Sequence, residues 1–232
     1  MQNLVFLTGA GMSAESGIST FRDSGGLWEQ YPVQQVASIE GYWQNPELVI
    51  NFYNERRKQL LDVQPNEGHR LVASLESKFK VNVITQNVDD LHERAGSTNV
   101  THLHGELMKA TSTDNPNDPT QVVTMPKDNL TIKMGDKAKD GSQLRPFIVW
   151  FGEAVPMIEP AIDLVSKADI LVVIGTSLNV YPAAGLIHYA SNTCKKYLID
   201  PHPANIPASM NVHIIAKGAS EGMKELCEIL NN

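Results

Sequence analysis

Short apolar runs, separated by polar and turn-forming segments, recur along this chain and predict buried strands. The runs are rich in β-branched residues and mostly unbroken, whereas a strand with one wetted face would alternate apolar and polar positions. An unbroken run fits a strand covered on both faces, as in a parallel sheet between layers of helices. The runs lie at residues 4–7, 81–84, 170–174, 197–199 and 212–215.

Helical patterns lie between and after these runs. Residues 47–61 follow a helical pattern, and a shorter helix over about 89–95 ends at Gly96, a usual cap residue. Residues 220–230 place apolar side chains at i, i+3, i+4 and i+7, which predicts a closing amphipathic helix. This stripe consists of Met223, Leu226, Cys227 and Leu230.

Two stretches interrupt the alternation of strands and helices. Residues 28–78 hold helical patterns without a clear strand, and residues 109–145 are polar and rich in turn signals. We therefore expect an α/β fold within a single domain, 1–232: a Rossmann-like parallel sheet with helices on both faces, plus a smaller module formed by two insertions. The expected Rossmann-like part covers about 1–27, 79–104 and 154–232, and the expected small module covers about 28–78 and 105–153.

Composition narrows the class of protein. The chain has 232 residues, of which 42% are hydrophobic and 19% charged, values typical of a soluble globular domain. A net charge of -7 argues against a general nucleic-acid binder, which needs a basic face to neutralise phosphates. The same charge suits basic partners such as lysine-rich protein segments.

Cysteine usage and the amino terminus favour a cytoplasmic location. Cys194 and Cys227 are the two cysteines, too few for a disulfide framework and too far apart for a metal knuckle. The first residues lead straight into an apolar strand, without the pattern of a signal peptide. No window approaches the length of a membrane helix, so we expect no membrane partner.

The first strand leads into a dinucleotide fingerprint of the form G-x-G-x-x-A. Gly9, Ala10 and Gly11 stand at the turn, where Gly9 would allow a tight bend and Gly11 would let backbone amides approach a pyrophosphate. A tight turn without a ligand is the alternative. A dehydrogenase would show an acidic residue about 20 positions later; residues 21–28 read as a loop instead.

The longer string at 9–22, GAGMSAESGISTFR, resembles the signature of sirtuins, the NAD-dependent protein deacylases. Three more segments match in order: TQNVD at 85–89, HLHGEL at 102–107 and GTSLNVYPAA at 175–184. The segment VWFGE at 149–153 is similar to the family's substrate-binding strand. The resemblance covers almost the whole chain and is closest to the bacterial class III branch of desuccinylases and deacetylases.

The resemblance implies a reaction and a catalytic base. In sirtuins the acyl oxygen of the substrate attacks C1′ of the nicotinamide ribose, nicotinamide leaves, and a histidine activates a ribose hydroxyl. His104 matches that histidine, and an imidazole with an ordinary pKa of about 6.5 accepts a proton at neutral pH. Asn87 is the second expected catalytic residue, whereas His102 is expected to be structural.

The resemblance also implies an NAD site. Instead of binding the cofactor, Asn87 or Asp89 could cap the helix that follows, and either residue could do both. Asp200 departs from the family, in which an Asn commonly contacts the adenosine ribose. The expected cofactor-binding residues are Gly9, Ala10, Gly11, Glu15, Phe21, Arg22, Trp28, Gln86, Asn87, Val88, Asp89, Gly175, Thr176, Ser177, Asp200 and Ala219.

Tyr53 and Arg56 predict an acyl pocket. They stand at i and i+3 of the expected helix and so share one face. In the branch of sirtuins that prefers succinyl, malonyl or glutaryl lysine, a Tyr-x-x-Arg pair binds the acyl carboxylate. Without the resemblance, a solvated amphipathic helix is the alternative. The other expected substrate-binding residues are Val149, Trp150, Phe151, Gly152 and Glu153.

The region that holds a structural zinc in many sirtuins, here about 109–144, contains neither Cys nor His. We therefore expect NAD and no zinc. The expected function is NAD-dependent removal of succinyl, malonyl and acetyl groups from protein lysines, releasing nicotinamide and O-acyl-ADP-ribose. The alternatives are a non-catalytic sensor of NAD or ADP-ribose, a protein ADP-ribosyltransferase and, third, a dehydrogenase.

Overall fold

The computed structural model describes residues 1–18, 31–126 and 128–231. At its centre lies a six-stranded sheet in the order β3-β2-β1-β7-β8-β9, in which all neighbouring strands are parallel. The chain winds outward from β1 in both directions, an arrangement that leaves a ligand crevice at the carboxyl ends of the central strands. The strands are β1 (Asn3–Thr8), β2 (Lys80–Thr85), β3 (Val100–His102), β7 (Ile170–Ile174), β8 (Lys195–Ile199) and β9 (Val212–Ile215).

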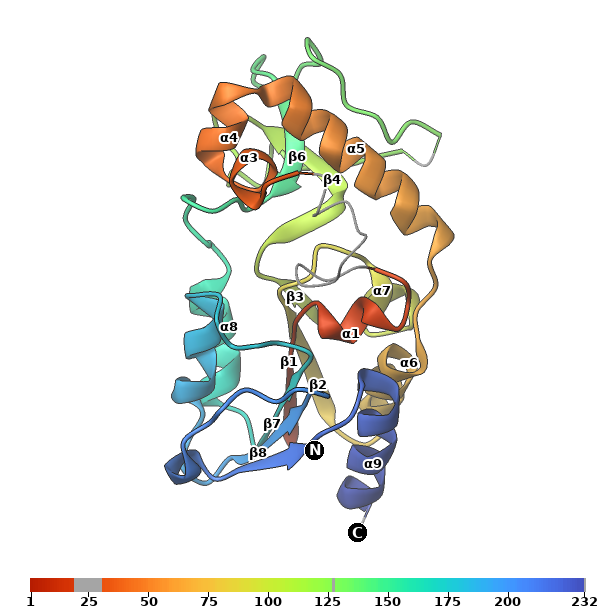
Figure 1. Cartoon of the computed structure of the whole chain (residues 1–232), viewed down its shortest axis with the longest axis vertical. Helices are drawn as coiled ribbons and strands as arrows, with labels where there is room; N and C mark the ends of the chain where they lie inside the picture. The colour runs from red at the N-terminus through yellow and green to blue at the C-terminus, as the bar shows by residue number, and fades with distance from the viewer. Residues whose placement is uncertain (19–30, 127, 232) are drawn as a thin grey trace.

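Helices cover both faces of this sheet (Figure 1). Leu4 and Phe6 of β1 join the core beneath α6 (Glu67–Ser74), η1 (Leu75–Ser77) and α9 (Ala219–Asn231). The intervening Val5 and Leu7 join the opposite core. That core lies beneath α8 (Ile158–Ser166) and η2 (Ala183–Tyr189). Because successive residues of a strand point to opposite faces, two covered faces require the unbroken apolar runs seen in the sequence.

The expected fold class is confirmed. All five predicted strands are present, with observed ends within two residues of the predicted ones. The short β3 was not predicted, because three residues carry too little pattern to distinguish a strand from a loop. The predicted helix at 47–61 is α5 (Pro46–Asp62), and the one at about 89–95 is α7 (Leu91–Arg94). Gly96 follows α7 with φ +108, as its cap position requires.

The smaller module lies beyond the carboxyl ends of the large sheet (Figure 1). A three-stranded antiparallel sheet in the order β5-β4-β6 packs with α5 around a third apolar core, which includes Tyr42, Phe52 and Trp150. Besides α5, its elements are α3 (Val33–Val36), α4 (Ile39–Gln44), β4 (Gly105–Ser112), β5 (Val123–Thr124) and β6 (Leu144–Ile148).

One segment lies elsewhere than its expected place. Helix α6 and the 3-10 turn η1 fall inside the 28–78 insertion, yet Val72 of α6 and Leu75 of η1 are buried in the core of the large sheet. The helix also lies close to α9, because Gly68 faces the Ala219 backbone: a Cβ added at Gly68 would lie 3.2 Å from the Ala219 carbonyl carbon. The first insertion therefore supplies the small module with α3 to α5 and returns to the large sheet at α6.

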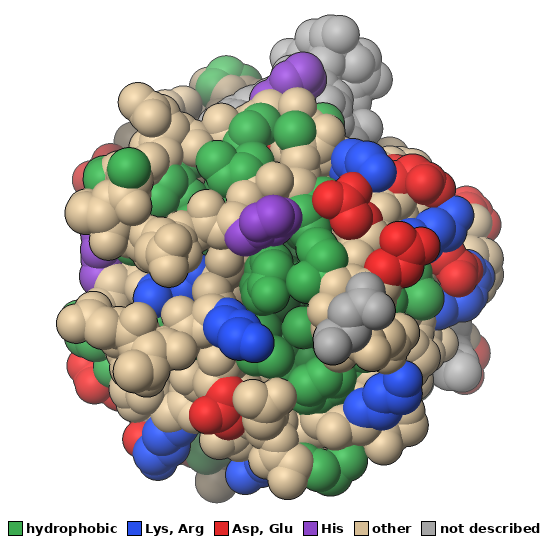
Figure 2. All heavy atoms as spheres, turned by 90° about the horizontal axis from the view of Figure 1, so that it is seen from below, with side chains coloured by type: hydrophobic (Ala, Val, Ile, Leu, Met, Phe, Trp, Pro, Cys, Tyr) green, Lys and Arg blue, Asp and Glu red, His purple; other side chains and the backbone are tan. Residues whose placement is uncertain are grey.

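Figure 2 shows the end of the molecule opposite the small module, where apolar side chains gather near the centre and charged side chains lie around them. Ile214 of the edge strand β9 is among the exposed large hydrophobic residues of the chain. Among the helices that the structure describes, none combines the length and the apolar character that crossing a bilayer requires.

Candidate functional site

The loops that follow β2, β1 and β7 meet at one edge of the sheet, because these strands are parallel neighbours. The Gly9 amide donates to the Ile174 carbonyl, and the Gln86 amide donates to the Thr8 carbonyl, both at 2.9 Å. The Gln86 side chain extends past β1 and donates to Thr176 Oγ1 at 3.2 Å. Three motifs that are distant in sequence thus form one continuous surface.

Gly9 and Gly11 allow the loop after β1 to approach the loop after β7. A Cβ at Gly9 would lie 2.7 Å from Thr176 Cβ, and one at Gly11 would lie 2.7 Å from Gly175 Cα. The Gly11 amide donates to the Gly175 carbonyl at 2.9 Å. The fingerprint predicts these glycines beside a phosphate; the structure gives them a further, steric reason, and the helix that follows, α1 (Gly11–Ala14), has four residues.

Asn87 and Asp89 join the loop after β2 to the loop after β1. Asn87 Nδ2 donates to the Gly9 carbonyl at 3.0 Å and to Ser13 Oγ at 3.1 Å, and Ser13 Oγ donates to Asp89 Oδ2 at 2.9 Å. Asp89 Oδ1 accepts from the amide of Leu91, the first residue of α7, so the helix-start contact belongs to Asp89. Burial raises the pKa of Asp89, although the hydrogen bonds from Leu91 and Ser13 oppose it.

His104 has the geometry of a neutral base. Its Nδ1 lies 3.0 Å from the Gln86 carbonyl oxygen, which only accepts hydrogen bonds, so Nδ1 carries the proton and Nε2 carries the lone pair. Burial lowers the pKa of His104, and the hydrogen bond to Gln86 partly offsets this. The imidazole is therefore unprotonated at neutral pH and ready to accept a proton.

The segment after β6 runs beside His104. The Val149 amide donates to the His104 carbonyl at 2.9 Å. On the other side, the Phe151 amide donates to the Ala37 carbonyl and the Phe151 carbonyl accepts from the Ile39 amide. The Phe151 side chain is 52% exposed, and Gly152 beside it has φ +91. Val149 and Phe151 thus tie this segment to the residue before β4 and to the residues around the start of α4.

Trp150 and Glu153 of the same segment point inward. Arg145 Nη1 and Nη2 donate to the two carboxylate oxygens of Glu153, both at 2.8 Å, and the Trp150 amide donates to Glu153 Oε2 at 2.9 Å. The Arg145 guanidinium lies 3.8 Å from the centroid of the buried Trp150 ring. The sequence predicts substrate contacts for both residues; in the structure they form the support of the segment.

Tyr53 and Arg56 lie on α5, as predicted. Tyr53 is 2% exposed and its hydroxyl accepts a hydrogen bond from Trp150 Nε1 at 3.1 Å. Burial raises the pKa of Tyr53 to about 12. Burial lowers the pKa of Arg56, while the charges of Tyr53 and Asp89 raise it. The Arg56 guanidinium lies 6.0 Å from the centroid of the Phe52 ring on the same helix.

Several other predicted residues have protein partners. Glu15 Oε1 accepts from the Ser220 amide at 3.1 Å, at the start of α9. Asp200 Oδ1 accepts from the His202 amide at 2.8 Å. Ala219 is buried in the core of the large sheet, and Ala10 and Val88 are partly exposed. Three predicted cofactor-binding positions lie outside the described residues: Phe21, Arg22 and Trp28.

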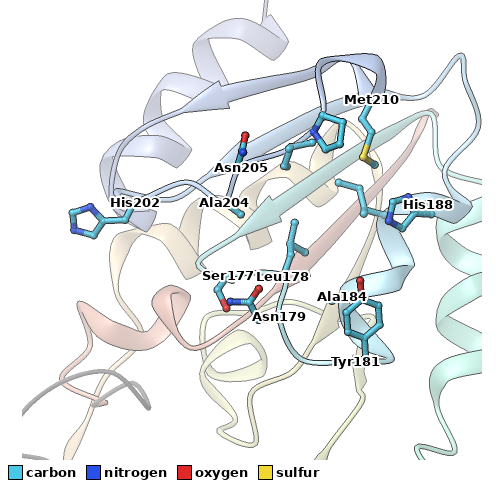
Figure 3. A pocket seen from close by; sticks show the side chains of 13 residues that line it. Ser177, Leu178, Asn179, Tyr181, Ala184, His188, His202, Ala204, Asn205 and Met210 are labelled. Carbon is cyan, nitrogen blue, oxygen red and sulfur yellow. The ribbon is translucent and has the colours of Figure 1, made fainter.

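A pocket of about 430 Å³ opens beside Ser177, between the loops that follow β7 and β8 (Figure 3). Apolar side chains from both loops line it together with two imidazoles and two carboxamides. The resemblance places the adenosine end of NAD next to Ser177 and Asp200. The lining residues are Ser177, Leu178, Asn179, Tyr181, Ala184, Ile187, His188, His202, Ala204, Asn205, Ile206, Pro207 and Met210.

A hydrogen-bonded cluster ties together the turns of the small module where many sirtuins hold zinc. Asp140 accepts from Ser112 Oγ at 2.5 Å and from Asn115 Nδ2 at 2.9 Å, and the Ser142 amide donates to its other oxygen at 3.0 Å. In the part of the chain that the structure describes, no group of three or more His, Cys, Asp or Glu residues is arranged to hold a metal ion.

Sequence reasoning missed residues that support the site. Ser13 stands inside the fingerprint, but its contact with Asp89 crosses 76 positions of sequence. Arg145 is a charged residue within the mostly buried strand β6, which is a recognisable sign of a buried ion pair. Neither residue carries a local pattern that identifies its partner.

The comparisons with known proteins agree with this geometry. The sequence model described as the Sir2 family matches residues 9–182. An NAD-dependent protein deacylase of Bacteroides thetaiotaomicron is 64% identical over 230 residues, covering 99% of this chain and 98% of the relative.

Two solved structures show the same fold over nearly the whole chain. A Sir2 homologue in complex with NAD aligns with a TM-score of 0.83 at 39% identity, covering 98% of this chain and 89% of the other. A Sir2 structure with deacetylated p53 peptide and 3′-O-acetyl ADP-ribose aligns with a TM-score of 0.78 at 30% identity, covering 97% and 92%. This chain belongs to the Sir2 family.

Proposed function

We propose that this Sir2 family enzyme is an NAD-dependent protein-lysine deacylase that removes succinyl, malonyl and acetyl groups and releases nicotinamide and O-acyl-ADP-ribose. The observation that carries the proposal is the state of His104. Its Nδ1 is held by the Gln86 carbonyl, which leaves a basic Nε2 at the edge of the sheet where Asn87 and Asp89 lie.

Each residue at this edge has a defined task in the proposed reaction. When bound, NAD supplies an electrophilic ribose carbon and a nicotinamide leaving group. His104 Nε2 takes the proton of a ribose hydroxyl, and its lowered pKa keeps the ring neutral until that step. Asn87, held on Gly9 and Ser13, and Gln86, held on Thr176, keep the sugar in reach of that nitrogen.

The acyl preference rests on Tyr53 and Arg56. The Trp150 indole nitrogen only donates, so the Tyr53 oxygen accepts from it and keeps its own proton for another acceptor. With a pKa of about 12, Tyr53 stays protonated at neutral pH. A phenol donor beside a guanidinium complements the carboxylate of a succinyl or malonyl group, and neither group obstructs a smaller acetyl group.

Protein lysines in the cytoplasm are the proposed substrates. The net charge of -7 favours approach by lysine-rich segments. A protein substrate is supported by the similar Sir2 structure that contains a deacetylated p53 peptide. Cys194 and Cys227 are both free thiols, which fits a reducing compartment.

Replacing Arg56 tests the acyl preference. Arg56→Met should lower kcat/KM for a succinyl-lysine peptide about 10- to 100-fold, because a charge-assisted bidentate pair is lost, and should change deacetylation by less than about threefold. Lys58→Met on the same helix is the control, since Lys58 is exposed and pairs with Glu55. Equal losses with succinyl and acetyl peptides would reject the carboxylate pocket and leave deacylation itself intact.

A further inference from the structure

Two histidines hold successive carbonyl groups of the loop after β2. His104 Nδ1 lies 3.0 Å from the Gln86 carbonyl oxygen, and His102 Nδ1 lies 3.1 Å from the Asn87 carbonyl oxygen. The two rings differ in what the second nitrogen meets. His102 Nε2 lies 2.7 Å from Glu93 Oε1, whereas His104 Nε2 is the nitrogen that takes the ribose proton in the proposed reaction. Both histidines therefore hold a carbonyl group of this loop, but the surroundings of their Nε2 atoms differ.

The partners of His102 decide its protonation. A carbonyl oxygen and an ionised carboxylate both only accept hydrogen bonds, so both ring nitrogens of His102 carry protons and the ring is an imidazolium. Burial disfavours the charged ring, but the hydrogen bond and the charge of Glu93 prevail and raise the pKa of His102. Burial likewise opposes the Glu93 carboxylate, yet the hydrogen bond from His102 leaves the pKa of Glu93 lowered.

The charge of His102 also acts on its surroundings. From α7, Glu93 and His92 face it, and from β4, Glu106 raises its pKa. In the loop after β2, the imidazolium lowers the pKa of Asp89 and so favours the carboxylate that burial disfavours. His102 thus contacts the backbone of Asn87 and favours the carboxylate of Asp89, and both are expected cofactor-binding residues.

We propose that His102 and Glu93 form a charged positioning pair, in which the imidazolium bonds to Glu93 and holds the Asn87 carbonyl so that the loop is ready to bind NAD. His102 acts through Asn87, whose carbonyl it contacts, and is a positioning residue, not the base. The inference rests on the proposed NAD-dependent reaction and is independent of which acyl group is removed.

Glu93→Gln tests the pair, because glutamine keeps the size and hydrogen-bonding reach of the side chain and removes its charge. Two midpoints are measured between pH 5 and 9: that of the His102 ring, by imidazole nitrogen resonances, and that of NAD affinity, by calorimetry. In the wild-type protein the ring should titrate above pH 6.5, and NAD affinity should fall as the pH rises through the same midpoint. In Glu93→Gln both midpoints should move down by at least about one pH unit, with NAD affinity at pH 7.5 about five- to tenfold weaker.

Glu106→Gln is the matched control. Glu106 faces His102 electrostatically but bonds to Lys109 at 2.7 Å, so its replacement should move either midpoint by less than about 0.3 units. Glu93→Asp should restore most of the NAD affinity, since it restores the carboxylate. The midpoint at which kcat falls on acidification reports the titration of His104, and it should be unchanged in all variants.

Three results would overturn the proposal. The first is a His102 ring that carries a single proton at pH 6.5 in the wild-type protein, a measurement that requires no turnover and no folded variant. The second is an affinity for NAD that is unchanged in Glu93→Gln. The third is a loss of affinity that is uniform across pH, which would assign Glu93 a purely structural role.

Discussion

Glu153→Gln distinguishes an internal support from a substrate contact. The Glu153 carboxylate accepts two hydrogen bonds from Arg145 and one from the Trp150 amide. The Arg145 side chain is 1% exposed and that of Glu153 is 15% exposed. Glutamine retains the shape but not the charge, so the variant leaves a buried guanidinium without its counterion.

The structure gives the magnitude of the loss. Removing one partner of a buried ion pair costs about 3–5 kcal/mol, and the partial exposure of Glu153 favours the lower end, about 3 kcal/mol. For a chain of this size, each kcal/mol lowers Tm by roughly 2–4 °C. We therefore expect Glu153→Gln to lower Tm by about 6–12 °C.

Calorimetry of matched variants measures this loss. Glu221→Gln removes the same charge from an exposed i,i+3 pair with Lys224 and should cost less than about 1 kcal/mol. Replacing both buried partners, as in Arg145→Met with Glu153→Leu, should recover much of the lost stability, because no uncompensated charge remains. An unchanged Tm together with a raised KM for the peptide would refute the reasoning and would place Glu153 in contact with substrate.

Three further predictions concern the base, one buried histidine and one glycine. His104→Ala should lower kcat at least about 100-fold with NAD affinity unchanged, and retained turnover in the variant would exclude His104 as the base. In the wild-type protein kcat should fall on acidification with a midpoint below about pH 6.5, because burial lowers the pKa of His104. His69 is buried and its pKa is lowered to about 4, so the folded state binds fewer protons than the unfolded chain below pH 6.5. The free energy of unfolding therefore falls by about 1.4 kcal/mol per pH unit toward pH 4. His69→Gln keeps a side chain able to bond the Asn66 amide, and its free energy of unfolding, measured with urea at each pH, should fall less steeply with pH; an identical pH dependence would contradict this assignment. Gly105→Ala should lower the free energy of unfolding by well above the roughly 1–2 kcal/mol expected for Gly141→Ala. Both glycines have positive φ, but a Cβ at Gly105 would lie 2.1 Å from the Phe147 carbonyl oxygen, whereas Gly141 faces open space. Equal Tm values for the two variants would reject this difference.

Local patterns in the sequence account for the elements of the large sheet. The run at 170–174 coincides with β7, in which all five residues are buried, because burial on both faces demands apolar residues at every position. The strands of the small module are harder to recognise. β4 includes Lys109 and Ser112 beside buried Leu107 and Ala110, so its sequence has neither an unbroken nor an alternating pattern.

The candidate site was predictable in its members but not in their arrangement. His104, Asn87 and Asp89 follow from ordered motifs, and the structure brings them to one edge of the sheet. Trp150 and Glu153 belong to a motif that also contains the exposed Phe151, and sequence alone did not separate the two groups. Which side chains of a short irregular segment face inward depends on the elements packed against it, here α4, α5 and β6.

The sequence alone determines the order of strands and helices along the chain, the glycine turns and the family of this protein. These features depend on neighbours within a few positions and on motifs that are recognisable in the sequence. The protonation of His102 and His104, the burial of Arg145 and the return of α6 to the large sheet are decided by tertiary structure. Each depends on a partner that folding brings near: Glu93, Gln86, Glu153 and α9. Hydrogen bonds and charges act between groups a few ångströms apart, and the number of residues between two groups in the sequence does not tell how far apart they are in space.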